Sequence, residues 1–137
     1  MSSQWPQSLP VAQLRIARPT ARLDEVVRFY REGLGLEVIG SFEAHAGYSG
    51  VMLGLPGHEH HLEFTSRIDG SPCPAPTKDN LLVFYIPDTE AIKRLTLRLN
   101  GMGYFAAQPE NPYWKQQGTT FEDPDGWRVV LMNTGGI

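Results

Sequence analysis

The sequence contains little cysteine, no strong excess of either charge and no long apolar run. Cys73 is the single cysteine among 137 residues, so the chain cannot form an internal disulfide or a cysteine-rich zinc site. Lys and Arg number 12 against 15 Asp and Glu, a net charge of −3, which disfavours general binding to nucleic acid or to an anionic membrane surface. No apolar run approaches the roughly 20 residues of a membrane helix, and the N-terminus lacks the pattern of a signal peptide. We therefore expect a cytoplasmic protein without nucleic-acid or membrane partners.

The composition is that of one globular domain. Hydrophobic residues make up 41% of the chain, and 14 glycines and 11 prolines indicate short elements separated by many turns. A glycine-rich phosphate loop is absent, and the sequence shows no Ser–His–Asp order typical of a hydrolase.

The first half of the chain, about residues 11–68, predicts a strand, a helix and three more strands. The run Val11–Arg18 alternates apolar and polar residues, as a half-buried strand does. Apolar residues then recur at helical spacing from Leu23 to Tyr30, and Gly33 is a natural helix end. Three strand-like runs follow: Leu36–Phe42, Tyr48–Leu55 and His60–Arg67.

The second half, about residues 80–133, repeats this order after a proline-rich linker, about residues 69–79. Leu81–Ile86 predicts a strand, and Asp88 is a suitable N-cap for the next helix. Three short strands are then predicted, the last two joined by a type I turn at D-P-D-G: Gly103–Ala106, Gly118–Glu122 and Trp127–Asn133. Residues 1–10 are interpreted as an N-terminal arm. The repeat predicts an α+β fold of two tandem βαβββ modules that form paired half-barrels around a central cavity.

Two motifs within this repeat carry a family resemblance. They are Phe29–Leu36, which reads F-Y-R-E-G-L-G-L, and Phe121–Gly126, which reads F-E-D-P-D-G. Over residues 11–133 the chain resembles the vicinal oxygen chelate superfamily, the group of glyoxalases, bleomycin resistance proteins and dioxygenases. The resemblance implies a small-molecule ligand in the cavity between the modules and a homodimer. The group includes metalloenzymes and metal-free drug-binding proteins, so fold alone does not choose the function.

The resemblance also implies where a metal would be bound. The metalloenzymes of the group take His or Glu ligands from the first and last strand of each module. These positions fall on Arg15, Glu63, Leu81 (or Asn80 after a one-residue slip) and Val130. A divalent ion needs three or more donors, and among these residues only Glu63 is a suitable ligand. We therefore expect no family-type metal site and no cofactor, and we expect Glu63 to pair with Arg15.

Strand alternation predicts which side chains line the cavity. One set is expected to pack outward on the helices: Leu14, Ile16, Leu62, Phe64, Leu82, Phe84, Val129 and Leu131. Their neighbours, together with aromatic residues of one loop, form the predicted ligand-binding set: Arg15, His61, Glu63, Tyr85, Tyr113, Trp114 and Arg128. An apolar side of the same pocket is expected from Leu81, Val83, Val130 and Met132. Such a pocket suits an amphipathic or aromatic ligand.

Two functions remain open at this point. The first is a metal-independent small-molecule binding protein. The second is an enzyme, a lyase or a dioxygenase-type oxidoreductase, with Glu63 and His61 as candidate catalytic residues. That enzyme would use Glu63 as a base without metal, or Zn, Mn, Ni or Fe bound by His61 and Glu63 with further donors. Structural alternatives stay open as well: Glu63 and Arg15 as a buried ion pair, and the loop aromatics as a cover for the core or a dimer contact.

Overall fold

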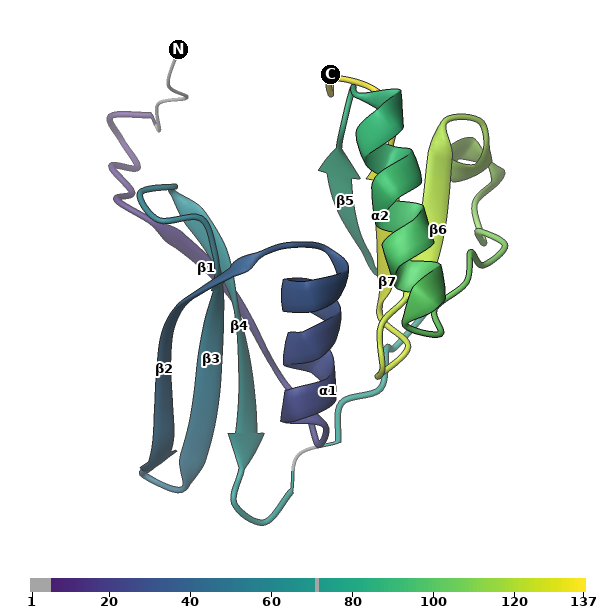
Figure 1. Ribbon diagram of the computed structural model, residues 1–137. Helices are drawn as coiled ribbons and strands as arrows, with labels where there is room; N and C mark the ends of the chain where they lie inside the picture. The colour runs from purple at the N-terminus through teal and green to yellow at the C-terminus, as the bar shows by residue number, and fades with distance from the viewer. Residues whose placement is uncertain (1–5, 71) are drawn as a thin grey trace.

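A computed structural model describes residues 6–70 and 72–137 and shows two modules, each a β-sheet with a helix on one face (Figure 1). Module one contains β1 (Leu14–Pro19), α1 (Leu23–Arg28), the π-helical turn η1 (Phe29–Gly33), β2 (Glu37–His45), β3 (Tyr48–Gly54) and β4 (His60–Arg67). Module two contains β5 (Leu81–Tyr85), α2 (Thr89–Gly101), the 3₁₀ turn η2 (Pro112–Lys115), β6 (Gly118–Glu122) and β7 (Arg128–Met132). The predicted α+β fold with two modules is confirmed. Residues 1–5 of the predicted N-terminal arm lie outside the described residues.

Each module has its own sheet. Sheet A, in module one, has the strand order β1-β4-β3-β2, and sheet B, in module two, has the order β5-β7-β6. The first and last strands of each module run parallel, with Arg15 beside His61 in sheet A and Val83 beside Val130 in sheet B. A parallel pair requires a crossover connection, and each module contains one helix between these two strands.

One predicted strand, Gly103–Ala106, is not formed. Only Ala107 pairs across to Thr120, as an isolated bridge. The reason lies in the end of α2, where the N–H groups of Gly103 and Tyr104 donate back to helix carbonyls and Gly103 takes a φ of +97°. That left-handed conformation closes the helix and uses the N–H groups that the strand would need.

The hydrophobic core lies on the helix-bearing faces of both sheets and joins the two modules. It contains Val26, Phe29, Tyr30, Leu53, Phe64, Ile92, Leu99, Phe121, Val129 and Leu131. A Cβ at Gly33 would lie 2.7 Å from Cδ2 of Leu99, so α2 packs directly on the end of the first helix where glycine leaves space. Most of the side chains expected to pack on the helices do so, but Leu14 and Ile16 are 42% and 52% exposed. That expectation is wrong for these two because β1 is an edge strand of sheet A.

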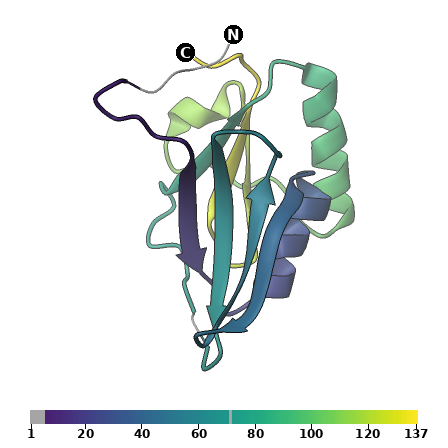
Figure 2. The same ribbon diagram turned by 90° about the vertical axis from the view of Figure 1, so that its left-hand side faces the viewer.

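The helix α1 lies between sheet A and module two (Figure 1). Viewed from the sheet A side, the four strands stand in front of both helices (Figure 2). The other face of sheet A therefore points away from module two, and the described residues of one copy place no helix over it. We call this surface the helix-free face of sheet A.

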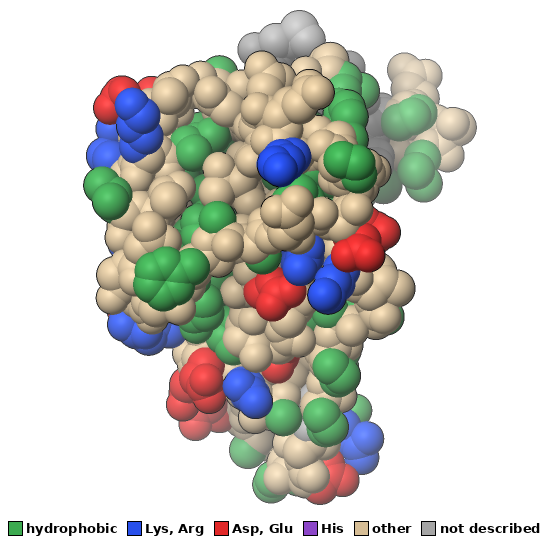
Figure 3. Space-filling model, turned by 90° about the vertical axis from the view of Figure 1, so that its right-hand side faces the viewer, with side chains coloured by type: hydrophobic (Ala, Val, Ile, Leu, Met, Phe, Trp, Pro, Cys, Tyr) green, Lys and Arg blue, Asp and Glu red, His purple; other side chains and the backbone are tan. Residues whose placement is uncertain are grey.

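The opposite side of the molecule carries acidic and basic side chains mixed with small separate apolar patches (Figure 3). No helix within residues 6–70 and 72–137 has the length and apolar character needed to cross a bilayer.

Candidate functional site

Three of the predicted ligand-binding residues meet on the helix-free face of sheet A. In β4, Leu62 and Phe64 pack against the helix-side core, so alternation places His61 and Glu63 on the opposite face. Arg15 lies beside His61 in the parallel pairing of β1 with β4. The strand register therefore brings Arg15, His61 and Glu63 together from two segments 46 to 48 residues apart.

The Arg15 guanidinium contacts both neighbours. Its Nε donates to Nε2 of His61 at 2.9 Å, and its Nη1 lies 3.5 Å from Oε1 of Glu63. The second contact is at the long limit of a hydrogen bond and acts mainly through charge. The Arg15 side chain is 47% exposed, whereas His61 and Glu63 are 6% and 8% exposed. Glu63 thus pairs with Arg15, as expected from the sequence.

Only one of the two ring nitrogens of His61 has a hydrogen-bond partner. Because Nε2 accepts from Arg15, the ring proton of a neutral His61 belongs on Nδ1. Nδ1 is buried and has no hydrogen-bond partner. A buried donor without a partner costs free energy, so Nδ1 is the unsatisfied polar atom of this cluster.

The other half of the same face is apolar, and it comes from β2 and β3. The residues that the sequence analysis expected for the apolar side lie instead in sheet B: Leu81, Val83, Val130 and Met132. Met52 pairs with Glu63 across β3 and β4 and therefore shares its face. A Cβ at Gly40 would lie 2.9 Å from Cε of Met52, and a Cβ at Gly50 would lie 2.6 Å from the ring of Phe42. Both side chains thus lie close over glycines, whose occurrence inside strands indicates such close approach.

These residues do not fit a divalent metal ion. Within the described part of the chain, no group of three or more His, Cys, Asp or Glu side chains is placed to share an ion. In addition, Nε of Arg15 occupies the lone pair of His61 Nε2, and a guanidinium beside the site opposes a second cation. The residues of this site therefore do not supply the donor set that the metalloenzymes require.

The other four predicted ligand residues lie on module two. Arg128 is 5% exposed, and its guanidinium donates to Oε2 of Glu122 at 3.0 Å and to the carbonyl oxygen of Gln108 at 2.8 Å. Tyr113 and Trp114 form an edge-to-face pair at 4.9 Å between ring centroids, and Tyr85 is half-exposed. Among the described residues, no hydrogen bond or ion pair joins these four to Arg15, His61 or Glu63. Their role in ligand binding stays a prediction.

A second polar cluster, at the junction of the modules, was not predicted. Arg18 of β1 forms ion pairs with Asp123 and, at 2.8 Å, with Asp125. The hydroxyl of Tyr30 donates to Oδ2 of Asp123 at 2.8 Å. The guanidinium also lies over the ring of Trp127, 5.0 Å from its centroid. The D-P-D-G turn is therefore a contact between modules as well as a hairpin turn.

Burial and charge shift the pKa values in this cluster. Burial alone would lower the pKa of Arg18, but the hydrogen bond with Asp125 and the charge of Asp123 raise it above its ordinary value. Burial, followed by the charge of Asp123, raises the pKa of Tyr30 well above 10.0. The arginine thus stays charged and the phenol keeps the proton that it donates. This cluster holds the modules together and leaves few groups for a ligand.

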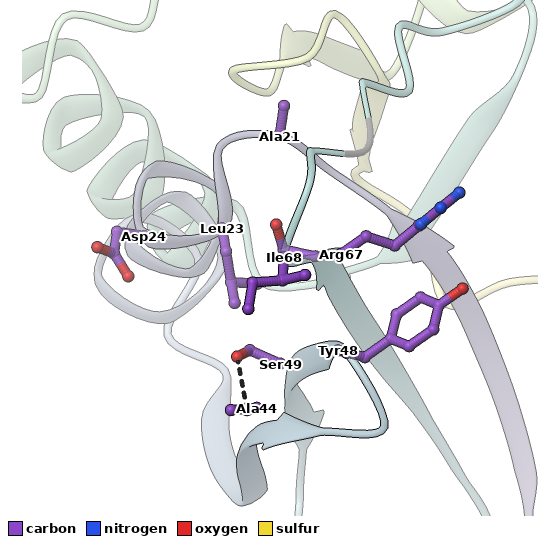
Figure 4. A pocket seen from close by; sticks show the side chains of 10 residues that line it. Ala21, Leu23, Asp24, Ala44, Tyr48, Ser49, Arg67 and Ile68 are labelled. Carbon is purple, nitrogen blue, oxygen red and sulfur yellow. Dashed lines mark hydrogen bonds between the residues drawn. The ribbon is translucent and has the colours of Figure 1, made fainter.

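A pocket of about 350 Å³ lies at the far end of sheet A, beside the β2–β3 turn (Figure 4). Leu23 and Ile68 meet in it, and Asp24 lies on the other side from Tyr48 (Figure 4). The N–H of Ala44 donates to Oγ of Ser49 at 3.1 Å. Its charged groups do not converge, so the helix-free face of sheet A is the stronger candidate of these two surfaces.

The comparisons with known proteins agree with this fold. A YycE-like N-terminal domain model matches residues 14–65, and a YycE-like C-terminal domain model matches residues 79–133. The chain is 55% identical over 130 residues to the YycE protein of Bacillus subtilis (strain 168), covering 95% of this chain and 94% of that protein.

Solved structures extend the comparison. A YycE protein from Bacillus subtilis, described as a candidate glyoxalase or fosfomycin resistance protein, matches with a TM-score of 0.92 at 52% identity over 98% of both chains. Glyoxalase I of Leishmania major has a TM-score of 0.70 at 21% identity, covering 88% of this chain and 85% of that one, and shares the fold. The chain therefore belongs to the YycE-like family, within the vicinal oxygen chelate superfamily of glyoxalases, bleomycin resistance proteins and dioxygenases.

Proposed function

We propose that this chain is a small-molecule binding protein that holds an amphipathic ligand against the helix-free face of sheet A. The observation that carries the proposal is that this face has one polar half and one apolar half. Arg15, His61 and Glu63 form a polar half on β1 and β4, and Met52 and Phe42 form an apolar half on β3 and β2. A ligand with a polar head and a flat apolar body would match both halves.

The burial of the polar half supports this interpretation. His61 and Glu63 are almost fully buried, and the strands fix their side chains against Arg15. Polar groups held in this way lose little conformational freedom when a ligand binds. The half-exposed Arg15 side chain is the member of the cluster that a ligand would meet first.

We propose that binding requires no metal ion. The alternative function is a metal-dependent lyase or dioxygenase with an ion on His61 and Glu63. The described residues supply no third donor for such an ion, and the Arg15 guanidinium already donates to the imidazole nitrogen of His61.

We also propose that the protein is a homodimer. Within the part of the chain that the structure describes, no helix covers the helix-free face of sheet A (Figure 1), and β1 and β2 are edge strands of that sheet. Exposed strand edges and open sheet faces are stabilised when a second chain covers them. A second copy on this side would turn the open face into a closed pocket.

A thermal-shift screen of aromatic and amphipathic compounds tests the proposed function. Compounds that bind the folded chain raise its melting temperature with concentration. The matched variants are Arg15→Ala at the site and Arg94→Ala on α2. We expect stabilising compounds that lose their effect in Arg15→Ala and keep it in Arg94→Ala. Stabilisation that is equal in both variants would place the ligand elsewhere, and a screen without any stabilising compound would contradict the proposal.

A further inference from the structure

We infer that the ligand binds through an uncharged head group that both accepts and donates hydrogen bonds, as a primary carboxamide does, and not through an anionic head. This inference rests on the proposed function and specifies the chemistry of the same site. It follows from the charges and the unused hydrogen-bonding atoms of Arg15, His61 and Glu63.

The charges of the site cancel. Arg15 carries one positive charge and Glu63 one negative charge, with 3.5 Å between Nη1 and Oε1. The lone pair of His61 Nε2 accepts from Arg15, so the imidazole is neutral in this arrangement. An anion approaching Arg15 would also approach Glu63, and the repulsion between the two anions offsets much of the attraction to the guanidinium. An anionic head would lose its hydration on binding, and the site would return little interaction free energy to offset that loss.

The atoms of the site that make no hydrogen bond include both donors and an acceptor. Among the described residues, Nη2 of Arg15 has no acceptor, and Oε2 of Glu63 has no donor. The Nδ1 of His61 is a buried donor without a partner. A carboxamide offers one oxygen that accepts from the half-exposed Arg15 guanidinium and one NH₂ group that donates to Glu63. A carboxylate offers acceptors only, so it would leave Glu63 without a donor beside a second negative charge.

The apolar half of the face specifies the body of the probe. Met52 and the ring of Phe42 lie close over Gly40 and Gly50, and they offer an apolar surface to the body of the ligand. The matched probes are 2-naphthamide and 2-naphthoate, because they share the naphthalene body and differ only in whether the head is a neutral donor and acceptor or an anion.

Isothermal titration of the full-length protein with both probes tests the inference. We expect the wild-type protein to bind 2-naphthamide about tenfold more tightly than 2-naphthoate, a difference of about 1.4 kcal/mol. Glu63→Gln removes the negative charge and keeps the shape of the side chain, so it leaves Arg15 unbalanced. In that variant we expect 2-naphthoate to bind more tightly than in the wild type, with the preference reversed.

The control is Glu90→Gln, which makes the same change of charge on α2, where Glu90 and Lys93 are both largely exposed. It should leave the preference unchanged. Raising the salt concentration supplies a second test without a variant, since binding of a neutral head to a neutral cluster should change little.

Two results would overturn the inference while the proposed function stands: tighter binding of 2-naphthoate to the wild type, or an equal effect of Glu63→Gln on both probes. Failure of both probes to bind the wild type would overturn the inference. The proposed function itself would be contradicted only if the thermal-shift screen also found no stabilising compound.

Discussion

Arg18 of β1 and Asp123 of the β6–β7 turn form an ion pair that joins the two modules across 105 residues of sequence. The carboxylate is fully buried and the arginine side chain is 13% exposed. Asp123 also accepts from the Tyr30 hydroxyl and from the N–H groups of Asp125 and Trp127. Burial raises the pKa of Asp123 above its ordinary value, and these partners together with Arg18 only partly oppose that rise.

Removal of one member of this pair should strongly destabilise the protein. Asp123→Asn leaves the buried Arg18 with Asp125 as its remaining charged partner, and removing one member of a buried ion pair costs up to about 3–5 kcal/mol. Urea denaturation measures the free energy of unfolding, with Glu90→Gln as the control that breaks a surface ion pair with Lys93. The control should cost less than about 1 kcal/mol. Equal stability of the two variants would show that the junction does not hold the modules together.

Tyr30→Phe should change how stability depends on alkaline pH. The pKa of Tyr30 is raised in the folded state by burial and by Asp123, so the folded protein retains this proton at a pH where the unfolded chain loses it. Stability from this group is present below the unfolded pKa of about 10 and is lost as pH rises through and above it. The variant should lose about 1–2 kcal/mol at neutral pH from the missing hydrogen bond. Its stability should then fall less steeply above pH 10, and an unchanged alkaline slope would contradict this account.

Glu63→Gln should leave the metal content of the purified protein unchanged. The described residues place no group of three metal-binding side chains together, so we assign Glu63 to Arg15 and not to an ion. Elemental analysis of both proteins, before and after treatment with a chelator, measures this directly. A stoichiometric ion in the wild type that disappears in the variant would show that Glu63 is a metal ligand.

The oligomeric state can be measured by sedimentation at micromolar concentrations. The chain has a mass of 15.3 kDa, and we expect a particle of about twice that mass because a second copy would cover the open face of sheet A. A mass equal to one chain over the whole concentration range would show that the face is open in solution.

The strand pattern was the part most accessible to prediction. His60–Arg67 and Gly118–Glu122 were predicted with the bounds that the structure has, because alternation and flanking turn residues are local signals. Gly103–Ala106 was wrong because the end of α2 uses the same backbone groups. Local alternation also placed Leu14 and Ile16 on a face covered by a helix. Alternation shows which face a side chain is on, but it does not show whether the helix reaches this edge strand.

The pairing of Arg15 with Glu63 was accessible because a resemblance placed both at one site and their charges are opposite. The ion pair of Arg18 with Asp123 could not be predicted from the sequence, because it depends on how the modules pack and no local pattern links residues so far apart. The glycines beneath Met52 and Phe42 were a visible signal, but only the strand register shows which side chains lie over them.

Titration of 2-naphthamide into the wild type and the Arg15→Ala variant, followed by calorimetry, tests the central claim most directly. If the helix-free face of sheet A holds the ligand's polar head, truncating Arg15 should weaken binding by about 1–3 kcal/mol, as for a lost hydrogen bond to a charged group. Arg94→Ala, on the exposed surface of α2, should bind as the wild type does. Equal affinity of the wild type and Arg15→Ala, with both proteins folded, would contradict the claim and place the site on another surface.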